Sequence, residues 1–123
     1  MTKHEDIPYI QHIADAIRDI ESFTENLNKS EFIKDNLRQS AVIRQLEVIG
    51  EATKNISAKF KKKYQQIEWK DIAGTRDKII HHYFGINLDI IWDIIKKDIP
   101  KLKKQINVVL EIELKQSYNR TNK

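Results

Sequence analysis

The segment RDKIIHHY, residues 76–83, concentrates the side chains of this chain that can do chemistry. Arginine binds phosphate through parallel N–H donors, and histidine gains and loses a proton close to neutral pH. Arg76, His81, His82 and Tyr83 therefore bring a cation, two imidazoles and a phenol into one short stretch. Together these groups suit a site that holds an anion such as phosphate and moves protons beside it.

The sequence around this segment predicts a helix over residues 69–84. Helical spacing from Ile72 places five positions on one face, namely Ile72, Arg76, Ile79, Ile80 and Tyr83. Arg76 is thus expected to be buried or half-buried in an apolar stripe, where an unpaired charge is costly. Two explanations stay open, a structural salt bridge to Glu47 or Glu51 on a neighbouring helix, or a site that receives an anion.

Composition and charge describe an ordinary globular protein. The 123 residues are expected to form one domain over 1–115 and a polar tail over 116–123. Cysteine is absent, which excludes disulfides and thiolate metal sites and is compatible with a reducing cytoplasm. We expect no signal peptide and no membrane span, because no window reaches the ~18 apolar residues that a span needs. The net charge of +4 favours acidic partners only weakly.

Apolar residues recur at intervals of three and four, which predicts helices along most of the chain. The expected helical regions are 5–27, 30–56 with an interruption allowed near 35–36, 69–84 and 88–115, with a lysine-rich connection over 57–68. Ser30 followed by acidic Glu31 predicts a helix N-cap. Gly50 interrupts good helix formers at a cost of about 1 kcal/mol, which is understandable if another backbone approaches closely.

These elements predict an all-α fold, an antiparallel up-down bundle of four to five helices. Pro100 lies inside the last helix, so we expect that helix to be kinked near this residue. Apolar residues of the second and last regions cover more than one helix face, for example Val42 with Ile43 and Ile90 with Ile91. A single small bundle would leave part of them uncovered, which favours a homodimer.

Other chemistries have little support in the sequence. Adjacent histidines point about 100° apart on a helix, and no further histidine follows at a spacing of four residues. We therefore expect no metal site and no cofactor. The chain has neither a glycine-rich phosphate loop nor a serine in a strand–turn–helix elbow.

The spacing of Arg76, four residues, His81, one residue and Tyr83 resembles the signature of HEPN domains in the HepT-like toxin family. Three further blocks resemble those of the family in the same order, namely AVIRQLEVIGEA (41–52), IEWKDIAGTRDKIIHHYFGIN (67–87) and IIWDIIKKDIPKLKKQI (90–106). The resemblance spans about residues 5–110. His82 competes with His81 for the motif histidine, and the position of Tyr83 favours His81. Asp77 fits a family preference for a polar residue after the arginine.

The resemblance implies a metal-independent endoribonuclease toxin, a HEPN-like dimeric bundle in which Arg76 and His81 line a cleft between protomers. It also implies a partner, a nucleotidyltransferase antitoxin of the MntA type, that silences the toxin by attaching AMP to Tyr83. Helix geometry agrees with a shared cleft, because His81 lies about 140° around an ideal helix from Arg76. Both side chains converge only if the helix ends near His82 or a second protomer contributes its copy.

Two other classes of function remain open at this stage. The chain can be a non-catalytic module that binds nucleotides or docks a nucleotidyltransferase, with Arg76 and His81 holding an anion. Alternatively it is a plain helical dimer in which Arg76 forms a structural ion pair. Only RNA cleavage that depends on both side chains distinguishes the nuclease from these alternatives.

Overall fold

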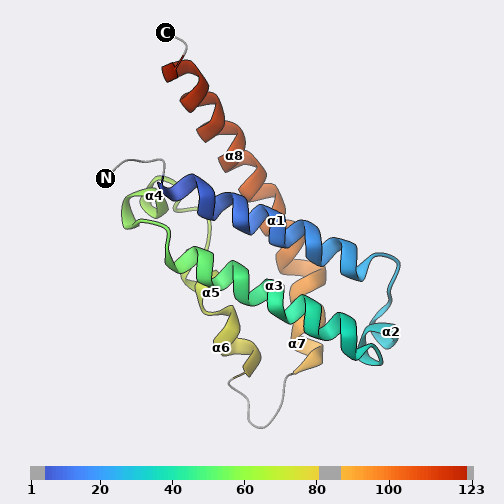
Figure 1. Cartoon of the computed structure of the whole chain (residues 1–123). Helices are drawn as coiled ribbons and strands as arrows, with labels where there is room; N and C mark the ends of the chain where they lie inside the picture. The colour runs from blue at the N-terminus through green and yellow to red at the C-terminus, as the bar shows by residue number, and fades with distance from the viewer. Residues whose placement is uncertain (1–4, 81–86, 122–123) are drawn as a thin grey trace.

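A computed structural model describes residues 5–80 and 87–121, and Figure 1 shows its course. All regular structure in these two ranges is helical, which confirms the predicted all-α class. In chain order the elements are α1 (Asp6–Thr24), α2 (Lys29–Ile33), α3 (Asn36–Lys54), α4 (Ala58–Lys63), α5 (Trp69–Ala73), α6 (Thr75–Ile80), α7 (Leu88–Asp93), the π-helix η2 (Ile94–Asp98) and α8 (Ile99–Thr121).

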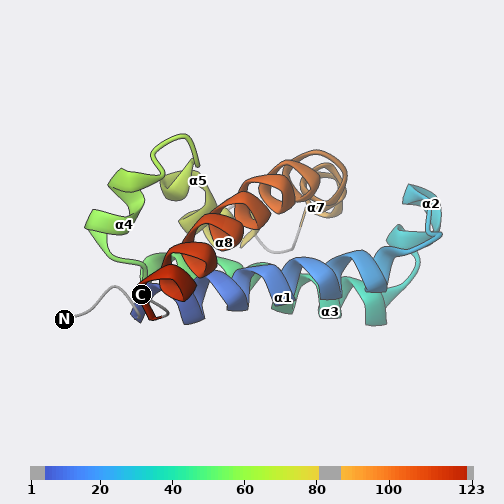
Figure 2. The ribbon, with the colours of Figure 1, turned by 90° about the horizontal axis from the view of Figure 1, so that it is seen from above.

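The long helices α1, α3 and α8 form the body of the bundle. Helices α1 and α3 lie side by side in opposite directions, and α8 crosses α1 (Figures 1 and 2). Helices α5 and α6 pack against α3, so the predicted reactive segment begins beside the middle of the bundle. No helix within the described ranges is both long and apolar enough to cross a membrane.

The predicted apolar stripes form the core. The spacing of three and four residues puts aliphatic side chains on one face of each long helix, and the buried members include Ile10, Ile13, Ile17 and Ile20 of α1, Val42, Leu46 and Ile49 of α3, and Leu102, Ile106 and Val109 of α8. Thr53 is also fully buried, and its hydroxyl donates to the Ile49 carbonyl at 2.7 Å. The periodic signal therefore identified the inner face of all three helices correctly.

The second helical region is interrupted where the sequence allowed it, but its first N-cap differs from the prediction. The cap is Asn28, not Ser30. The Asn28 side chain accepts from the Glu31 N–H at 2.8 Å, and the Glu31 carboxylate accepts from the Asn28 N–H at 2.9 Å. This reciprocal capping box uses Glu31 at the third helical position, which explains why the helix begins before Ser30.

The predicted continuous helix over residues 69–84 is wrong, because Gly74 separates α5 from α6. Gly74 caps α5 by donating its N–H to the carbonyls of Lys70 and Ile72. Across from this break, the Ile72 and Ala73 carbonyl oxygens lie 3.7 and 3.5 Å from where a Cβ of Gly50 would stand. A neighbouring backbone therefore approaches Gly50 as expected, but at ordinary van der Waals distances that leave room for a Cβ.

The last helical region changes geometry where the kink was predicted. The Ile99 N–H donates to the Ile94 carbonyl, five residues back, so the chain forms a π turn just before Pro100. Pro100 follows as the second residue of α8 and has no N–H to donate, so the change of geometry coincides with the position where the helical hydrogen-bond pattern must be interrupted. Figure 1 shows the chain bending between α7 and α8. Helix α8 continues to Thr121, beyond the predicted end near Lys115.

Candidate functional site

Arg76 lies on α6 with 60% of its side chain exposed. The expectation that it sits buried in an apolar stripe is therefore wrong. Of that stripe, Ile79 is buried and Ile72 is half-buried. The break at Gly74 is the physical reason, because the helical spacing from Ile72 does not continue through it into α6.

Glu47 is the partner of Arg76. Arg76 Nε donates to Glu47 Oε2 at 3.2 Å, joining α6 to the middle of α3. The predicted salt bridge is thus present, with Glu47 rather than Glu51 as the acceptor. Glu47 is 31% exposed, and an ion pair this open to water contributes at most about 1 kcal/mol to stability. The pair therefore orients the guanidinium more than it stabilises the fold.

Only one edge of the guanidinium is occupied by Glu47. The two terminal nitrogens of Arg76 make no hydrogen bond with any residue in the ranges 5–80 and 87–121. A guanidinium binds phosphate oxygens through pairs of parallel N–H donors. Arg76 is consequently held in place through Nε, while its outer donors have no partner in the described part of the chain and the side chain is largely exposed, which suits an arginine that binds an anion.

The other predicted site residues are less informative. Asp77 lies on α6, is exposed, and has no hydrogen-bond partner within the described part of the chain. His81, His82 and Tyr83 lie outside the described residues. The structure thus brings Arg76 together with Glu47, and the roles assigned to the two histidines and the tyrosine stay predictions.

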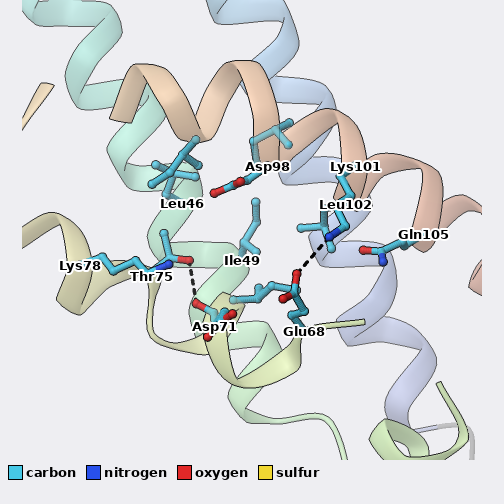
Figure 3. A pocket seen from close by; sticks show the side chains of 13 residues that line it. Leu46, Ile49, Glu68, Asp71, Thr75, Lys78, Asp98, Lys101, Leu102 and Gln105 are labelled. Atoms are coloured by element: carbon cyan, nitrogen blue, oxygen red, sulfur yellow. Dashed lines mark hydrogen bonds and ion pairs between the residues drawn. The ribbon is translucent and has the colours of Figure 1, made fainter. Parts of the chain in front are cut away.

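A pocket that the sequence did not predict opens between α3, α5, α6, η2 and α8 (Figure 3). Two of its lining residues, Thr75 and Lys78, lie on α6, the helix that carries Arg76. Its polar lining is Glu68, Asp71, Thr75, Lys78, Asp98, Lys101 and Gln105. These residues come from separate elements and form no local motif. The only sequence signal that pointed toward them was their position close to the reactive segment and to the Pro100 kink.

A cluster of three polar side chains, Lys63, Tyr64 and Glu113, links the end of α4 to the C-terminal part of α8. Glu113 is 7% exposed and accepts from the Lys63 ammonium at 2.7 Å and from the Tyr64 hydroxyl. Burial, and then the hydrogen bond to Glu113, raises the pKa of Tyr64 well above its usual range. Asp6 of α1 similarly accepts hydrogen bonds from the N–H and the hydroxyl of Ser57, the N-cap of α4, both at 2.8 Å.

Comparison with known proteins identifies the family. A family profile described as Ribonuclease HepT-like matches residues 13–109. A Methanocaldococcus jannaschii protein named as an RNase is 46% identical over 111 residues, covering 90% of this chain and 92% of the relative. A Caldanaerobacter subterraneus protein, also named as an RNase, is 42% identical over 106 residues, covering 86% and 95%.

A Thermococcus cleftensis protein named as a ribonuclease HepT is 47% identical over 95 residues, covering 77% of this chain and 86% of the relative. No solved structure gives a significant match. The profile spans the greater part of α1, all of α3, the first half of α8 and the whole reactive segment, so the similarity includes the region around Arg76. The chain belongs to the HepT-like ribonuclease family.

Proposed function

We propose that this protein is a metal-independent endoribonuclease and the toxin of a toxin–antitoxin pair, acting on RNA in the cytoplasm. The observation that carries the proposal is Arg76, an exposed side chain oriented through Nε by Glu47 whose outer donors have no partner among the described residues. Family membership supports the nuclease assignment, because the profile is described as a ribonuclease. The resemblance of the motif to HEPN toxins supports the biological role.

The proposed reaction uses the ribose of the substrate as the nucleophile. His81 takes the proton of the 2′-hydroxyl, the 2′-oxygen attacks the adjacent phosphorus, and the bond from phosphorus to the 5′-oxygen breaks. The leaving 5′-oxygen receives a proton from solvent water, which leaves a 2′,3′-cyclic phosphate and a 5′-hydroxyl. Arg76 stabilises the charge that builds on the phosphorane oxygens through its two outer donors.

We also propose that the active site is shared by two protomers. His81 and Arg76 lie about 140° apart on an ideal helix, so one straight helix does not bring both to one phosphate. Exposed apolar side chains support a partner surface, and the most exposed are Ile33, Leu37, Val108, Ile112, Leu114 and Tyr118. Light scattering at micromolar concentration should give the mass of a dimer, and a monomer there would contradict the shared site.

Regulation is proposed to act at Tyr83, through AMP attached by a nucleotidyltransferase antitoxin of the MntA type. Tyr83 follows Arg76 by seven residues, about 20° around an ideal helix and two turns along it. A phosphate on its hydroxyl would bring negative charge to the place where Arg76 binds RNA. The adduct would then inhibit by occupying the site.

The decisive experiment is expression of wild type, His81→Ala and the matched control His82→Ala, with growth and RNA integrity as readouts. We expect wild type and His82→Ala to arrest growth and cleave RNA, and His81→Ala to do neither while remaining folded. The competing function is a non-catalytic anion-binding module, which the exposed side chain of Arg76 also suits. Purified wild type that binds RNA without cleaving it would favour that module.

A further inference from the structure

The pocket between α3, α5, α6, η2 and α8 has an apolar floor and a polar mouth, and it holds about 150 Å³. Pockets for drug-sized ligands usually hold about 300–1,000 Å³, so this one suits a single planar ring system. Its floor is made of aliphatic side chains from four elements, Leu46, Ile49, Ile72, Ile94, Ile99 and Leu102. Such a floor favours the face of a base over a solvated phosphate.

The charges at the mouth also argue against phosphate. Lys101 Nζ pairs with Glu68 Oε1 at 3.1 Å, so those two charges offset one another (Figure 3). Asp71, Asp98 and Lys78 remain, and their side chains make no hydrogen bond with a residue in the described ranges. Two carboxylates against one ammonium favour a neutral ligand that presents several N–H donors and one strong acceptor.

Guanine is the RNA base that presents this pattern. Its N1–H and N2 amino group are adjacent donors that match the two oxygens of one carboxylate, and O6 beside them is an acceptor. Figure 3 shows the Asp98 carboxylate on the α8 side of the pocket, with Lys78 and Thr75 on the α6 side. Asp98 can accept the donor pair while Lys78 donates to O6, and the aliphatic floor contacts the ring.

We propose that this pocket is a base-recognition subsite of the enzyme and that it selects guanine in the RNA substrate. The inference rests on the proposed ribonuclease function. Thr75 and Lys78 line the pocket and flank Arg76 on α6, while Leu46 of its floor precedes Glu47 on α3. The pocket and the Arg76–Glu47 ion pair are therefore built on the same two helices, α6 and α3.

Binding tests the subsite independently of cleavage. Short fluorescent 2′-O-methyl oligonucleotides cannot be cleaved by 2′-hydroxyl attack, and a set that differs only in one central G, inosine, A, C or U isolates the base. Bidentate recognition of a base provides about 1–3 kcal/mol of discrimination. We therefore expect the Kd for G to be about 10-fold lower than for A, C or U, with inosine intermediate because it lacks the N2 amino group.

The variants assign the preference to the pocket. Asp98→Asn should bind G and A equally, whereas Asp93→Asn, which removes the same charge from an exposed position of α7, should keep the wild-type preference. Equal Kd values for G and A in wild type, no measurable binding of any oligonucleotide, or a preference that survives Asp98→Asn would each overturn the inference. If wild type prefers G but leaves unmodified RNA intact, the nuclease proposal fails and the subsite stands.

Discussion

Replacing Arg76 by alanine should remove activity while leaving the fold nearly as stable as before. The Arg76 side chain is 60% exposed and its only described ion pair joins Nε to Glu47 at 3.2 Å. Two unit charges about 4 Å apart attract by about 1 kcal/mol in water, and exposed pairs measure about 0–1 kcal/mol. For a domain of this size, the melting temperature should fall by only a few degrees.

The effect on the reaction should be much larger. Losing a donor that stabilises transition-state charge usually costs about 100- to 1,000-fold in rate. RNA cleavage by Arg76→Ala should therefore fall at least this far, and Arg76→Lys should recover only part of it, since an ammonium lacks the paired donors. Glu47→Ala should retain more activity than Arg76→Ala, because it releases the guanidinium without removing it.

Thermal melting and cleavage of a labelled RNA, measured on the same preparations, decide between the two roles. The double variant Arg76→Ala, Glu47→Ala provides the coupling energy of the pair, expected below about 1 kcal/mol. A loss of more than about 2 kcal/mol of stability in Arg76→Ala, with cleavage reduced only in proportion to the folded fraction, would show that Arg76 is structural and refute the reasoning.

Three further outcomes follow from the structure. Gly50→Ala should raise the melting temperature, because alanine gains about 1 kcal/mol in a helix and its Cβ would meet the Ala73 carbonyl at an ordinary 3.5 Å; a lower melting temperature would contradict this. The Tyr64 pKa is raised in the folded chain, so the contribution of the neutral phenol to stability is present below pH ~10 and declines above it. The free energy of unfolding measured in urea should therefore fall less at alkaline pH in Tyr64→Phe than in wild type. Intact mass after incubation with the cognate nucleotidyltransferase and ATP should show AMP on wild type and none on Tyr83→Phe; equal gains would exclude Tyr83 as the target.

The long helices were predictable from the sequence because the apolar residues that become buried recur at a regular helical spacing. Ile91, Ile95 and Ile99 follow a spacing of four, and all three are buried. The pattern carries this information without any knowledge of the neighbouring helix, since an amphipathic helix must turn its apolar face inward. The kink near Pro100 was equally predictable, because proline lacks the N–H that a helix interior needs.

The site was less predictable, since it depends on a local break and on contacts between distant segments. Gly74 ends α5, yet a single glycine inside a helical pattern is usually tolerated at a cost of about 1 kcal/mol. This one interruption made the helical spacing from Ile72 invalid for Arg76. The sequence offered both Glu47 and Glu51 as partners, and only the packing of α6 against α3 distinguishes them.

The π turn between α7 and α8 gives this part of the chain one residue of latitude in its length. Each residue advances a helix by about 100°, and a π turn accommodates an additional one. Trp92 before the turn and Leu102 after it are both buried. A single deletion at Lys97 would remove the additional residue and let the helix run on in regular α form, with both segments keeping their apolar faces toward the core. The same deletion within the regular part of α8 would rotate the following residues by about 100° and turn buried side chains toward solvent. Evolution can therefore alter the length of the last helical region most easily at this turn.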